Sequence, residues 1–315
     1  MKKILVTGGA GFIGSNITDF LLENGYKVRV LDNLVTGNKD NIKHHNSNPN
    51  FEFMYGDITN LEHVRKACKQ VDAICHQAAL GSVPRSIEDP LSSHNTNVNG
   101  FLNILLVAKE VGIKRVVYAS SSSVYGDEPN LPKVESRIGK QLSPYAITKF
   151  IDELYGRIFT EMYDMECIGF RYFNVFGPRQ DPNGAYAAVI PKFIDSLKKG
   201  EAPSINGDGT FSRDFTYIAN VVQANFLGLT TENKECFGQI VNIGAGGRVT
   251  ILEMYNIIKE SMGLTIEPLH RENRRGDIPH SNADVDKAKR LLGYEPKVSF
   301  REGIELLLES LDQKV

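Results

Sequence analysis

The feature that most constrains the fold is a glycine-rich turn between an apolar segment and an amphipathic one near the start of the chain. "KILVT" at residues 3–7 predicts a strand, and "FIGSNITDFLLENG" at 12–25 predicts a helix. Gly8, Gly11 and Gly14 give the turn a GxxGxxG spacing. Glycine lets the backbone approach a pyrophosphate, whose charge suits a helix N-terminus. The turn therefore predicts a dinucleotide site, with a glycine-rich turn that binds nothing as the alternative.

The first half of the chain continues this alternation of short apolar segments and amphipathic ones. Further strands are expected at 27–32, 51–57, 71–79, 115–121 and 166–174, and further helices at 61–70, 100–112 and from about 144. Strands that alternate with helices imply a parallel, doubly wound sheet. We therefore expect a Rossmann-type α/β fold.

The pattern changes near residue 176, where "FGPRQDPNGAY" is typical of a loop. Shorter strands and helices follow without strict alternation. We expect a large domain over 1–175, to which about 215–245 also belongs. A smaller α/β domain is expected mainly over 176–315, interleaved with the first.

Composition excludes several classes of partner. The net charge of −2 gives no reason to expect nucleic acid or an anionic membrane as partner. No apolar run approaches the roughly 18 residues of a membrane helix, and the apolar start is too short for a signal peptide. Four scattered cysteines predict no disulfide framework and no metal site, at Cys68, Cys75, Cys167 and Cys236. A cytoplasmic protein is expected.

Two carboxylates end predicted strands on the side of the glycine turn. Asp32 lies 18 residues beyond Gly14, where it can accept hydrogen bonds from a ribose and repel a 2′-phosphate. NAD is therefore expected rather than NADP. Asp57 could receive an adenine amino group, but a loop-capping role is an equal alternative.

The stretch "LSPYAITK" predicts a helix start that carries two chemical groups. Ser143 suits an N-cap and Pro144 the first helical position. Tyr145 and Lys149 are then one turn apart on one face. A phenol has an ordinary pKa of about 10 and is a poor base at neutral pH, but a nearby ammonium favours the phenolate. The alternative is a surface pair. The helix continues in the apolar spacing of Ile147, Ile151, Leu154 and Ile158.

The glycine turn, the serines of "ASSSSVYG" and YxxxK together resemble the extended short-chain dehydrogenase/reductase family. The similarity runs through "RYFNVFGPRQ", "GDGTFSRDFTYI" and "RRGDIPHSNAD". It is closest to NAD-dependent nucleotide-sugar 4-epimerases. "LGSVPRS", "LPKVE" and "QDPNGAYAAVIPKF" carry a narrower likeness to those that act on UDP-N-acetylhexosamines.

The resemblance implies a catalytic trio of Ser121, Tyr145 and Lys149. Because four serines stand in a row, Ser120 or Ser122 is the alternative to Ser121. Tyr145 would take the proton of the C4 hydroxyl while the C4 hydride passes to NAD+. The 4-keto sugar would rotate, and hydride and proton would return to the other face. Related dehydratases and decarboxylases carry Thr-Asp-Glu where this chain has three serines, so epimerisation is preferred to elimination.

The resemblance also implies two sets of binding residues. The cofactor set is Gly8, Gly11, Phe12, Ile13, Gly14, Asp32, Asn33, Asp57, Ile58, Gln77, Ala78, Ala79, Asn97, Tyr145, Lys149 and Tyr172. For Asn97, helix capping is a comparable explanation. The substrate set is Ser82, Ser121, Ser122, Ser123, Tyr145, Asn174, Ala188, Val189, Arg213, Arg274, Asp277 and Ser281.

Four of the substrate assignments have specific implied roles. Arg213 and Arg274 would bind the diphosphate, for which the planar guanidinium suits bidentate contacts, and Arg275 is the alternative to Arg274. Asp277 would hold a uridine ribose hydroxyl. Ser281 would leave space for an acetamido group, with capping of a helix near Asp284 as the alternative.

These residues lead to one preferred function and three alternatives. The preferred function is interconversion of UDP-N-acetylglucosamine and UDP-N-acetylgalactosamine, with bound NAD and a homodimer as the resemblance implies. The alternatives are 4-epimerisation of a UDP-N-acetyl-hexuronic acid, 4-epimerisation of UDP-glucose, and a non-catalytic NAD-binding regulator. The intact Ser121, Tyr145 and Lys149 argue against the regulator.

Overall fold

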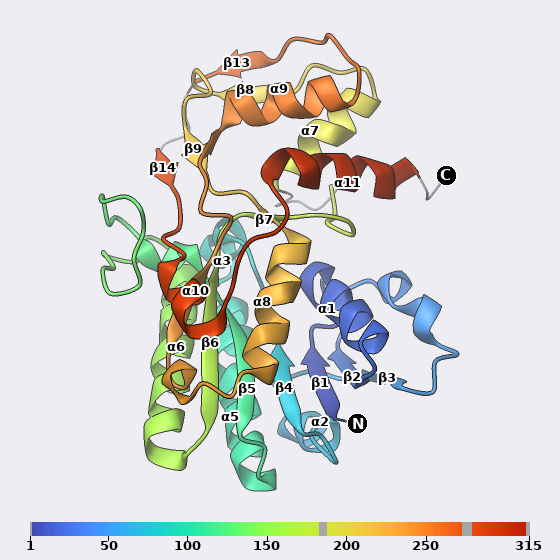
Figure 1. Cartoon of the computed structure of the whole chain (residues 1–315), viewed down its shortest axis with the longest axis vertical. Helices are drawn as coiled ribbons and strands as arrows, with labels where there is room; N and C mark the ends of the chain where they lie inside the picture. The colour runs from blue at the N-terminus through green and yellow to red at the C-terminus, as the bar shows by residue number, and fades with distance from the viewer. Residues whose placement is uncertain (1, 183–187, 273–278, 313–315) are drawn as a thin grey trace.

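The computed structural model describes residues 2–182, 188–272 and 279–312. Its larger lobe is a seven-stranded parallel sheet in the order β11-β6-β5-β4-β1-β2-β3 (Figure 1). The strands are β1 (Lys3–Thr7), β2 (Lys27–Asp32), β3 (Phe51–Tyr55), β4 (Ala73–His76), β5 (Arg115–Ser121), β6 (Glu166–Tyr172) and β11 (Ile240–Ile243). The predicted Rossmann-type α/β fold is confirmed. The strand order reverses between β1 and β4, the point beside which open α/β sheets bind ligands.

Helices cover both faces of this sheet. One face carries α1 (Phe12–Glu23) and α8 (Ile218–Thr230). The other carries α2 (Leu61–Ala67), α5 (Gly100–Val111) and α6 (Pro144–Tyr163). The chain enters α5 through α3 (Val83–Glu88), α4 (Pro90–His94) and the π-helical turn η3 (Asn95–Asn99).

The smaller lobe lies beyond the carboxyl ends of the strands (Figure 1). Its helices are α7 (Val189–Lys198), α9 (Ile251–Ser261) and α11 (Phe300–Asp312). Its short strands are β7 (Val175–Phe176), β8 (Ser204–Asn206), β9 (Ser212–Arg213), β10 (Thr216–Tyr217), β12 (Val249–Thr250), β13 (Leu269–Arg271) and β14 (His280–Ser281). The chain crosses between the lobes more than once, because α8, β11 and α10 (Asp286–Leu292) all pack on the larger lobe.

Hydrophobic cores on the two faces of the sheet differ in extent. The core under α2, α5 and α6 stays within the larger lobe and includes Phe101 and Tyr118. The core under α1 and α8 continues into the smaller lobe through Phe176, Tyr217 and Phe300. The ring centroid of Phe176 lies 5.5 Å from that of Tyr217 and 5.3 Å from that of Phe300. The two lobes are therefore joined by continuous apolar packing.

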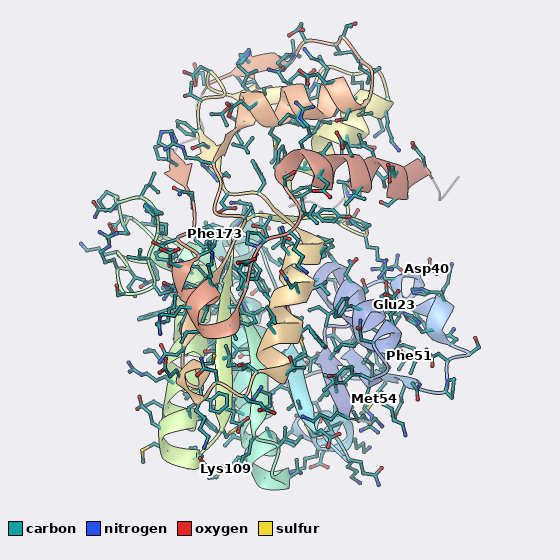
Figure 2. The ribbon with its side chains drawn as sticks, in the orientation of Figure 1. Glu23, Asp40, Phe51, Met54, Lys109 and Phe173 are labelled. Carbon is teal, nitrogen blue, oxygen red and sulfur yellow. The ribbon has the colours of Figure 1, made fainter. Side chains whose placement is uncertain are left out.

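A third, smaller cluster attaches the segment after β14 to the sheet. Phe173, which is labelled in Figure 2, is completely buried against Tyr125, with ring centroids 6.0 Å apart. Ala283 completes this cluster. The contact brings residues around 281–283 close to the carboxyl ends of β5 and β6.

Helix α6 begins as its sequence predicts. The Ser143 hydroxyl accepts a hydrogen bond of 3.1 Å from the Ala146 amide, and Pro144 is the first helical residue. The face that α6 buries contains Lys149, Asp152 and Glu153 beside Ala146 and Phe159, whereas five of its larger apolar residues are exposed. These exposed residues are Ile147, Leu154, Ile158, Met162 and Tyr163. Of the helices that the structure describes, none is both long and apolar enough to span a bilayer.

Candidate active site

A cavity of about 520 Å³ opens at the carboxyl ends of β1, β2 and β4. It lies at the reversal of strand order, where the fold places a dinucleotide. Twelve residues of the predicted cofactor set line it: Gly8, Gly11, Phe12, Ile13, Gly14, Asp32, Asn33, Asp57, Ile58, Gln77, Ala78 and Ala79. Their roles in cofactor binding stay predictions.

The glycine loop in this cavity has no room for side chains. Gly8 has a φ of +67°, and a Cβ at Gly8 would lie 2.7 Å from the backbone of Ala78. A Cβ on Gly14 would lie 2.2 Å from the Gly8 carbonyl oxygen. Gly11 is the N-cap of α1 and supplies no capping side chain, so the first amides of the helix face the cavity uncapped. This cradle fits the pyrophosphate of a dinucleotide.

Asp32 lies at the end of β2, where its carboxylate holds two loops together. It accepts hydrogen bonds from the Ala10 amide at 2.9 Å and from the Leu34 amide at 2.8 Å. Burial raises the pKa of Asp32 against the effect of these two bonds. Asp32 thus orders the cofactor loop as well as lining the cavity.

Asp57 takes the loop-capping geometry that was one of its two predicted roles. One carboxylate oxygen accepts bonds of 2.7 Å from both the amide and the hydroxyl of Thr59, and the other accepts the Asn33 amide at 2.8 Å. Although partial burial works against ionisation, these bonds lower the pKa of Asp57. The residue also lines the cavity, so capping does not exclude the adenine contact.

Asn97 acts on the site through a loop. Its side chain is completely buried and bonds to the Leu80 amide at 2.8 Å, to the Leu80 carbonyl oxygen and to the Thr148 hydroxyl. It lies within η3 and not at a helix cap, contrary to the capping alternative. Asn97 therefore fixes the cavity wall at Leu80 to helix α6.

Tyr172 is buried at the end of β6 beneath the cofactor cavity. Its hydroxyl donates toward Gln77 and Asn225, at 3.2 and 3.1 Å, and accepts a bond of 2.8 Å from the Asn225 amide. Burial raises the pKa of Tyr172 well above its ordinary value. Asn225 was not predicted, because it comes from α8, more than 50 residues further along the chain.

The serines at the end of β5 point in different directions. Ser120 is buried, and its hydroxyl donates to Glu153 at 2.6 Å. Ser121 is half-buried and caps the 3-10 turn η4 (Ser122–Tyr125), accepting the Ser123 amide at 3.1 Å. The geometry thus favours Ser121 over Ser120 as the catalytic hydroxyl. Ser122 and Ser123 are half-buried beside it.

Helix α6 packs against β5 and η4, which brings Lys149 to the serines. Lys149 is only 1% exposed, and its ammonium donates to the Ala119 carbonyl oxygen at 3.0 Å, two residues before Ser121. Tyr145, one turn earlier, is half-buried, and its amide donates to the Ser86 hydroxyl at 3.0 Å. Helix α6 therefore brings Lys149 to the carboxyl end of β5 near Ser121, and the catalytic roles of Ser121, Tyr145 and Lys149 stay predictions.

Asp152 is a charged neighbour of this site that sequence reasoning missed. Its carboxylate lies 3.2 Å from the Lys149 ammonium, and both side chains are buried. Burial raises the pKa of Asp152 to about 7, although the Lys149 charge opposes the shift. The available signal was an acidic residue three positions after Lys149, on the same helix face.

A second cavity, of about 200 Å³, lies in the smaller lobe and contains three residues of the predicted substrate set. Asn174, Val189 and Arg213 line it together with Phe211 and Phe215. The Arg213 guanidinium donates to the carbonyl oxygens of residues 212 and 279. An arginine beside an apolar wall suits a nucleoside diphosphate.

Ser281 lies next to this second cavity. It occupies β14, in parallel register with Arg213 of β9. Helix α10 begins only at Asp286 and has Val285 at its N-cap, so Ser281 does not cap it. The capping alternative for Ser281 is therefore wrong.

The other predicted substrate residues have mixed positions. Ser82 has a φ of +103° and caps α3 through its hydroxyl, which accepts the Arg85 amide. Ala188 is exposed at the N-cap of α7. Arg274, its alternative Arg275, and Asp277 lie outside the described residues.

Asp214 connects the pieces around the second cavity and was also missed. Its buried carboxylate accepts bonds from the amides of Ala245, Gly246 and Ala283 at 2.8 to 3.2 Å. Burial raises the pKa of Asp214 to about 6 against the effect of these bonds. Because its partners lie 31 to 69 residues away, no local sequence signal could identify it.

The chain is similar to several known proteins over nearly its whole length. The NAD dependent epimerase/dehydratase family matches residues 4–244. A Methanocaldococcus jannaschii protein with a provisional assignment as a UDP-glucose 4-epimerase is 41% identical over 304 residues, 96% of each chain. A solved UDP-N-acetylglucosamine 4-epimerase from Methanobrevibacter ruminantium M1, in complex with UDP-N-acetylmuramic acid, has a TM-score of 0.94 and 37% identity, and the match covers 100% of this chain and 99% of that one.

A third similarity concerns the cofactor. The solved UDP-glucuronic acid 4-epimerase from Bacillus cereus, in complex with UDP-glucuronic acid and NAD, has a TM-score of 0.90 and 30% identity. That match covers 99% of this chain and 100% of the other. The three relatives thus share the fold over nearly their whole length but differ in the sugar that their names give.

Proposed function

Because the chain belongs to the NAD-dependent epimerase/dehydratase family, we propose that it is an NAD-dependent UDP-sugar 4-epimerase. The observation that carries the proposal is the buried Lys149 ammonium, one turn from Tyr145 and in contact with the strand that ends in Ser121. A non-catalytic NAD-binding protein would not need to bury a cation at this edge of the sheet.

The proposed roles follow from the position of each group. The glycine loop and the Asp32 side of the cavity would hold NAD, which would supply the acceptor and donor of the C4 hydride. Tyr145 takes the proton of the C4 hydroxyl and gives it back after the sugar has turned. The Lys149 ammonium supplies a fixed positive charge one helical turn from this tyrosine. Ser121 hydrogen-bonds the C4 oxygen in both halves of the reaction.

Epimerisation is preferred to elimination because of what stands beside Ser121. Ser122 and Ser123 occupy the positions after it, where an elimination would need an acid or a base. Their hydroxyls can orient a sugar but have no accessible pKa for that proton transfer. Ser122 and Ser123 therefore favour reversible C4 oxidation over elimination.

UDP-N-acetylglucosamine and UDP-N-acetylgalactosamine are the proposed substrates. Ser281 supports this choice, because it is small, half-buried and in register with the diphosphate candidate Arg213. A C2 acetamido group adds several heavy atoms and needs space at this wall. UDP-glucose and UDP-glucuronate, named for two of the relatives, are the competing substrates.

The proposal is tested by incubating the NAD-loaded protein with UDP-N-acetylglucosamine, UDP-glucose and their uronic forms, and by resolving the C4 epimers. We expect the acetylated hexose to turn over fastest. Ser281→Tyr should abolish this activity but spare UDP-glucose, and Ser281→Ala should keep it as the matched control. If Ser281→Tyr turned over UDP-N-acetylglucosamine as fast as the wild type does, Ser281 would no longer support the choice of acetylated substrates.

A homodimer is proposed for the assembled enzyme. The exposed apolar residues of α6 recur on one face, and α5, which packs beside α6, exposes Leu106 and Val111. Met162, for example, is 68% exposed. A contiguous apolar face of this kind marks a protein contact. A second copy, presenting the same two helices, would cover it with a self-complementary interface.

A further inference from the structure

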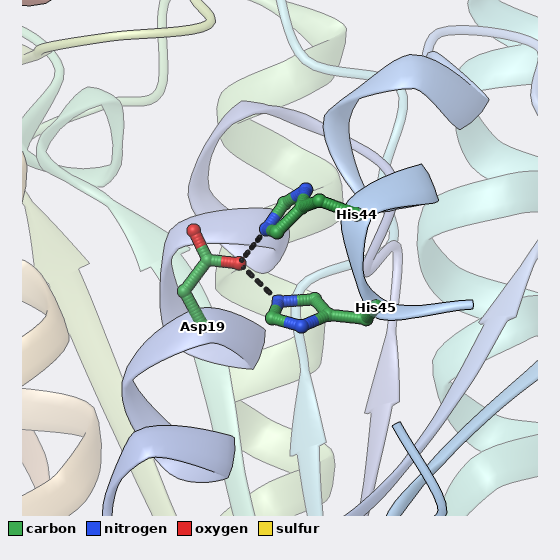
Figure 3. Close-up of side chains that lie close together, drawn as sticks. All are labelled: Asp19, His44 and His45. Atoms are coloured by element: carbon green, nitrogen blue, oxygen red, sulfur yellow. Dashed lines mark hydrogen bonds and ion pairs between the residues drawn. The ribbon is translucent and has the colours of Figure 1, made fainter. Parts of the chain in front are cut away.

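Two consecutive histidines and one aspartate converge outside the proposed active site (Figure 3). His44 and His45 end the 3-10 turn η2 (Lys43–His45), and Asp19 lies on α1. Both imidazoles point at the same carboxylate oxygen: the Nε2 atoms of His44 and His45 lie 3.1 and 2.6 Å from Asp19 Oδ1. The two rings are 4.0 Å apart, centroid to centroid. We propose that Asp19, His44 and His45 bind a divalent transition-metal ion such as Zn²⁺.

The spacing of the three ligand atoms fits such an ion. All three lie within 4.8 Å of one another. An ion with bonds of about 2.0–2.2 Å in tetrahedral geometry separates its ligands by roughly 3.4 Å. The two N···O distances therefore need to widen by less than about 1 Å. The metal replaces the imidazole hydrogens that now face the carboxylate.

The chemistry of the donors favours a transition metal over Mg²⁺ or Ca²⁺. Two imidazole nitrogens and one carboxylate oxygen suit Zn²⁺, Co²⁺ and Ni²⁺, whereas the hard cations prefer oxygen ligands. The His44 side chain is 48% exposed, so solvent can supply the remaining ligand. His45 is mostly buried and rests on Phe51, with ring centroids 5.5 Å apart, which orients its ring.

Arg179 sets both the rigidity and the strength of the site. Its guanidinium pairs with Asp19 Oδ2, which leaves Oδ1 for the metal. A hydrogen-bonded partner of this kind orients a ligating carboxylate. Its positive charge also weakens metal binding, so the affinity is expected to be below that of buried structural zinc sites. The bound ion would tie α1 to the segment after β2, and through Arg179 to the start of the smaller lobe.

The test uses tag-free full-length protein, freed of metal by a chelator and titrated with Zn²⁺ by calorimetry or with Co²⁺ by visible absorption. We expect one equivalent to bind, with the intense absorption of tetrahedral Co²⁺, and the melting temperature to rise. His44→Gln/His45→Gln should weaken binding at least 100-fold and abolish the rise, while glutamine can still hydrogen-bond to Asp19. His270→Gln, an exposed histidine of the smaller lobe, is the control.

Two results would overturn the proposal. One is wild-type protein that binds Zn²⁺ no better than the double variant when circular dichroism shows both folded. The other is a His270→Gln variant that loses as much affinity as the double variant. In either case the cluster is a hydrogen-bonded pair of histidines on a carboxylate and nothing more.

Discussion

Lys149 is the residue on which the chemistry of the site depends. An ammonium that is removed from water loses several kcal/mol of hydration, so a lysine that is 1% exposed needs nearby compensation. The Ala119 carbonyl oxygen and the Asp152 carboxylate supply it. This arrangement holds a cation at a fixed position one helical turn from Tyr145.

The role of Tyr145 is tested by removing its hydroxyl. Tyr145→Phe keeps the ring, and the amide of residue 145 can still bond to Ser86. Turnover should fall by about 10²- to 10⁴-fold, the usual contribution of a general acid–base group, while NAD stays bound. Steady-state assays and cofactor content by absorbance measure both. Near-wild-type turnover would exclude Tyr145 as the acid–base group.

His76 makes stability depend on pH. It is completely buried, its Nδ1 bonds to the Thr7 hydroxyl at 2.8 Å, and burial followed by the Lys149 charge lowers the pKa of His76 to about 3. An unfolded histidine has a pKa of about 6.5. Between these values the unfolded chain binds a proton that the folded chain does not, so the free energy of unfolding falls as pH drops below 6.5.

The expected loss between pH 7.5 and 5.5 is about 1.4 kcal/mol from His76 alone. His76→Asn has no titratable side chain at position 76. Between pH 7.5 and 5.5 its free energy of unfolding should therefore fall by about 1.4 kcal/mol less than that of the wild type. Urea unfolding at the two pH values measures the difference. Parallel curves for the wild type and His76→Asn would contradict the burial of a neutral imidazole.

At the scale of elements, the loops around the two cavities are held by long-range polar contacts. Asp214, between β9 and β10, bonds to the turn after β11 and to Ala283. Asp214→Ala removes the shared acceptor of three amides, of which the Ala283 amide is buried, and should lower the free energy of unfolding by about 1–3 kcal/mol. Chemical denaturation measures this difference. Asp208→Ala, at an exposed turn, is the control, and its free energy of unfolding should stay close to that of the wild type.

Strands, helix starts and the glycine loop could be predicted because each has a local signal. The expected strand at 71–79 is shorter in the structure, since Gln77 to Ala79 leave the sheet to line the cavity. The face that α6 buries was not predictable from hydropathy, because the helix buries Lys149, Asp152 and Glu153 but exposes Ile147, Leu154 and Ile158. A polar buried face is recognisable only once the partners across it are known.

The same limit applies to the candidate sites. The GxxGxxG loop and YxxxK are compact patterns with one physical reason each. Asn225 and Asp214 act through partners many residues away, and Asp19 is 25 residues from His44. Tertiary contacts of this length leave no periodic trace in a single sequence.

At the scale of the whole molecule, the exposed face of α5 and α6 predicts the assembly state. Leu154→Glu, on α6, would place a charge in the proposed dimer interface and should shift sedimentation from dimer to monomer. Leu269→Glu is the control, since Leu269 is also exposed but belongs to β13 of the smaller lobe. A Leu154→Glu protein that stays dimeric would place the interface elsewhere.

The lobes share one apolar core, which would hold the two cavities in a fixed relation during the proposed turn of the sugar. In the proposed reaction, hydride leaves C4 and returns to the same C4 within one closed site. The direct measurement uses UDP-N-acetylglucosamine deuterated at C4. We expect NMR to show UDP-N-acetylgalactosamine that keeps the deuterium at C4. Product that has lost the label to solvent, or no C4 epimer at all, would contradict the proposed reaction.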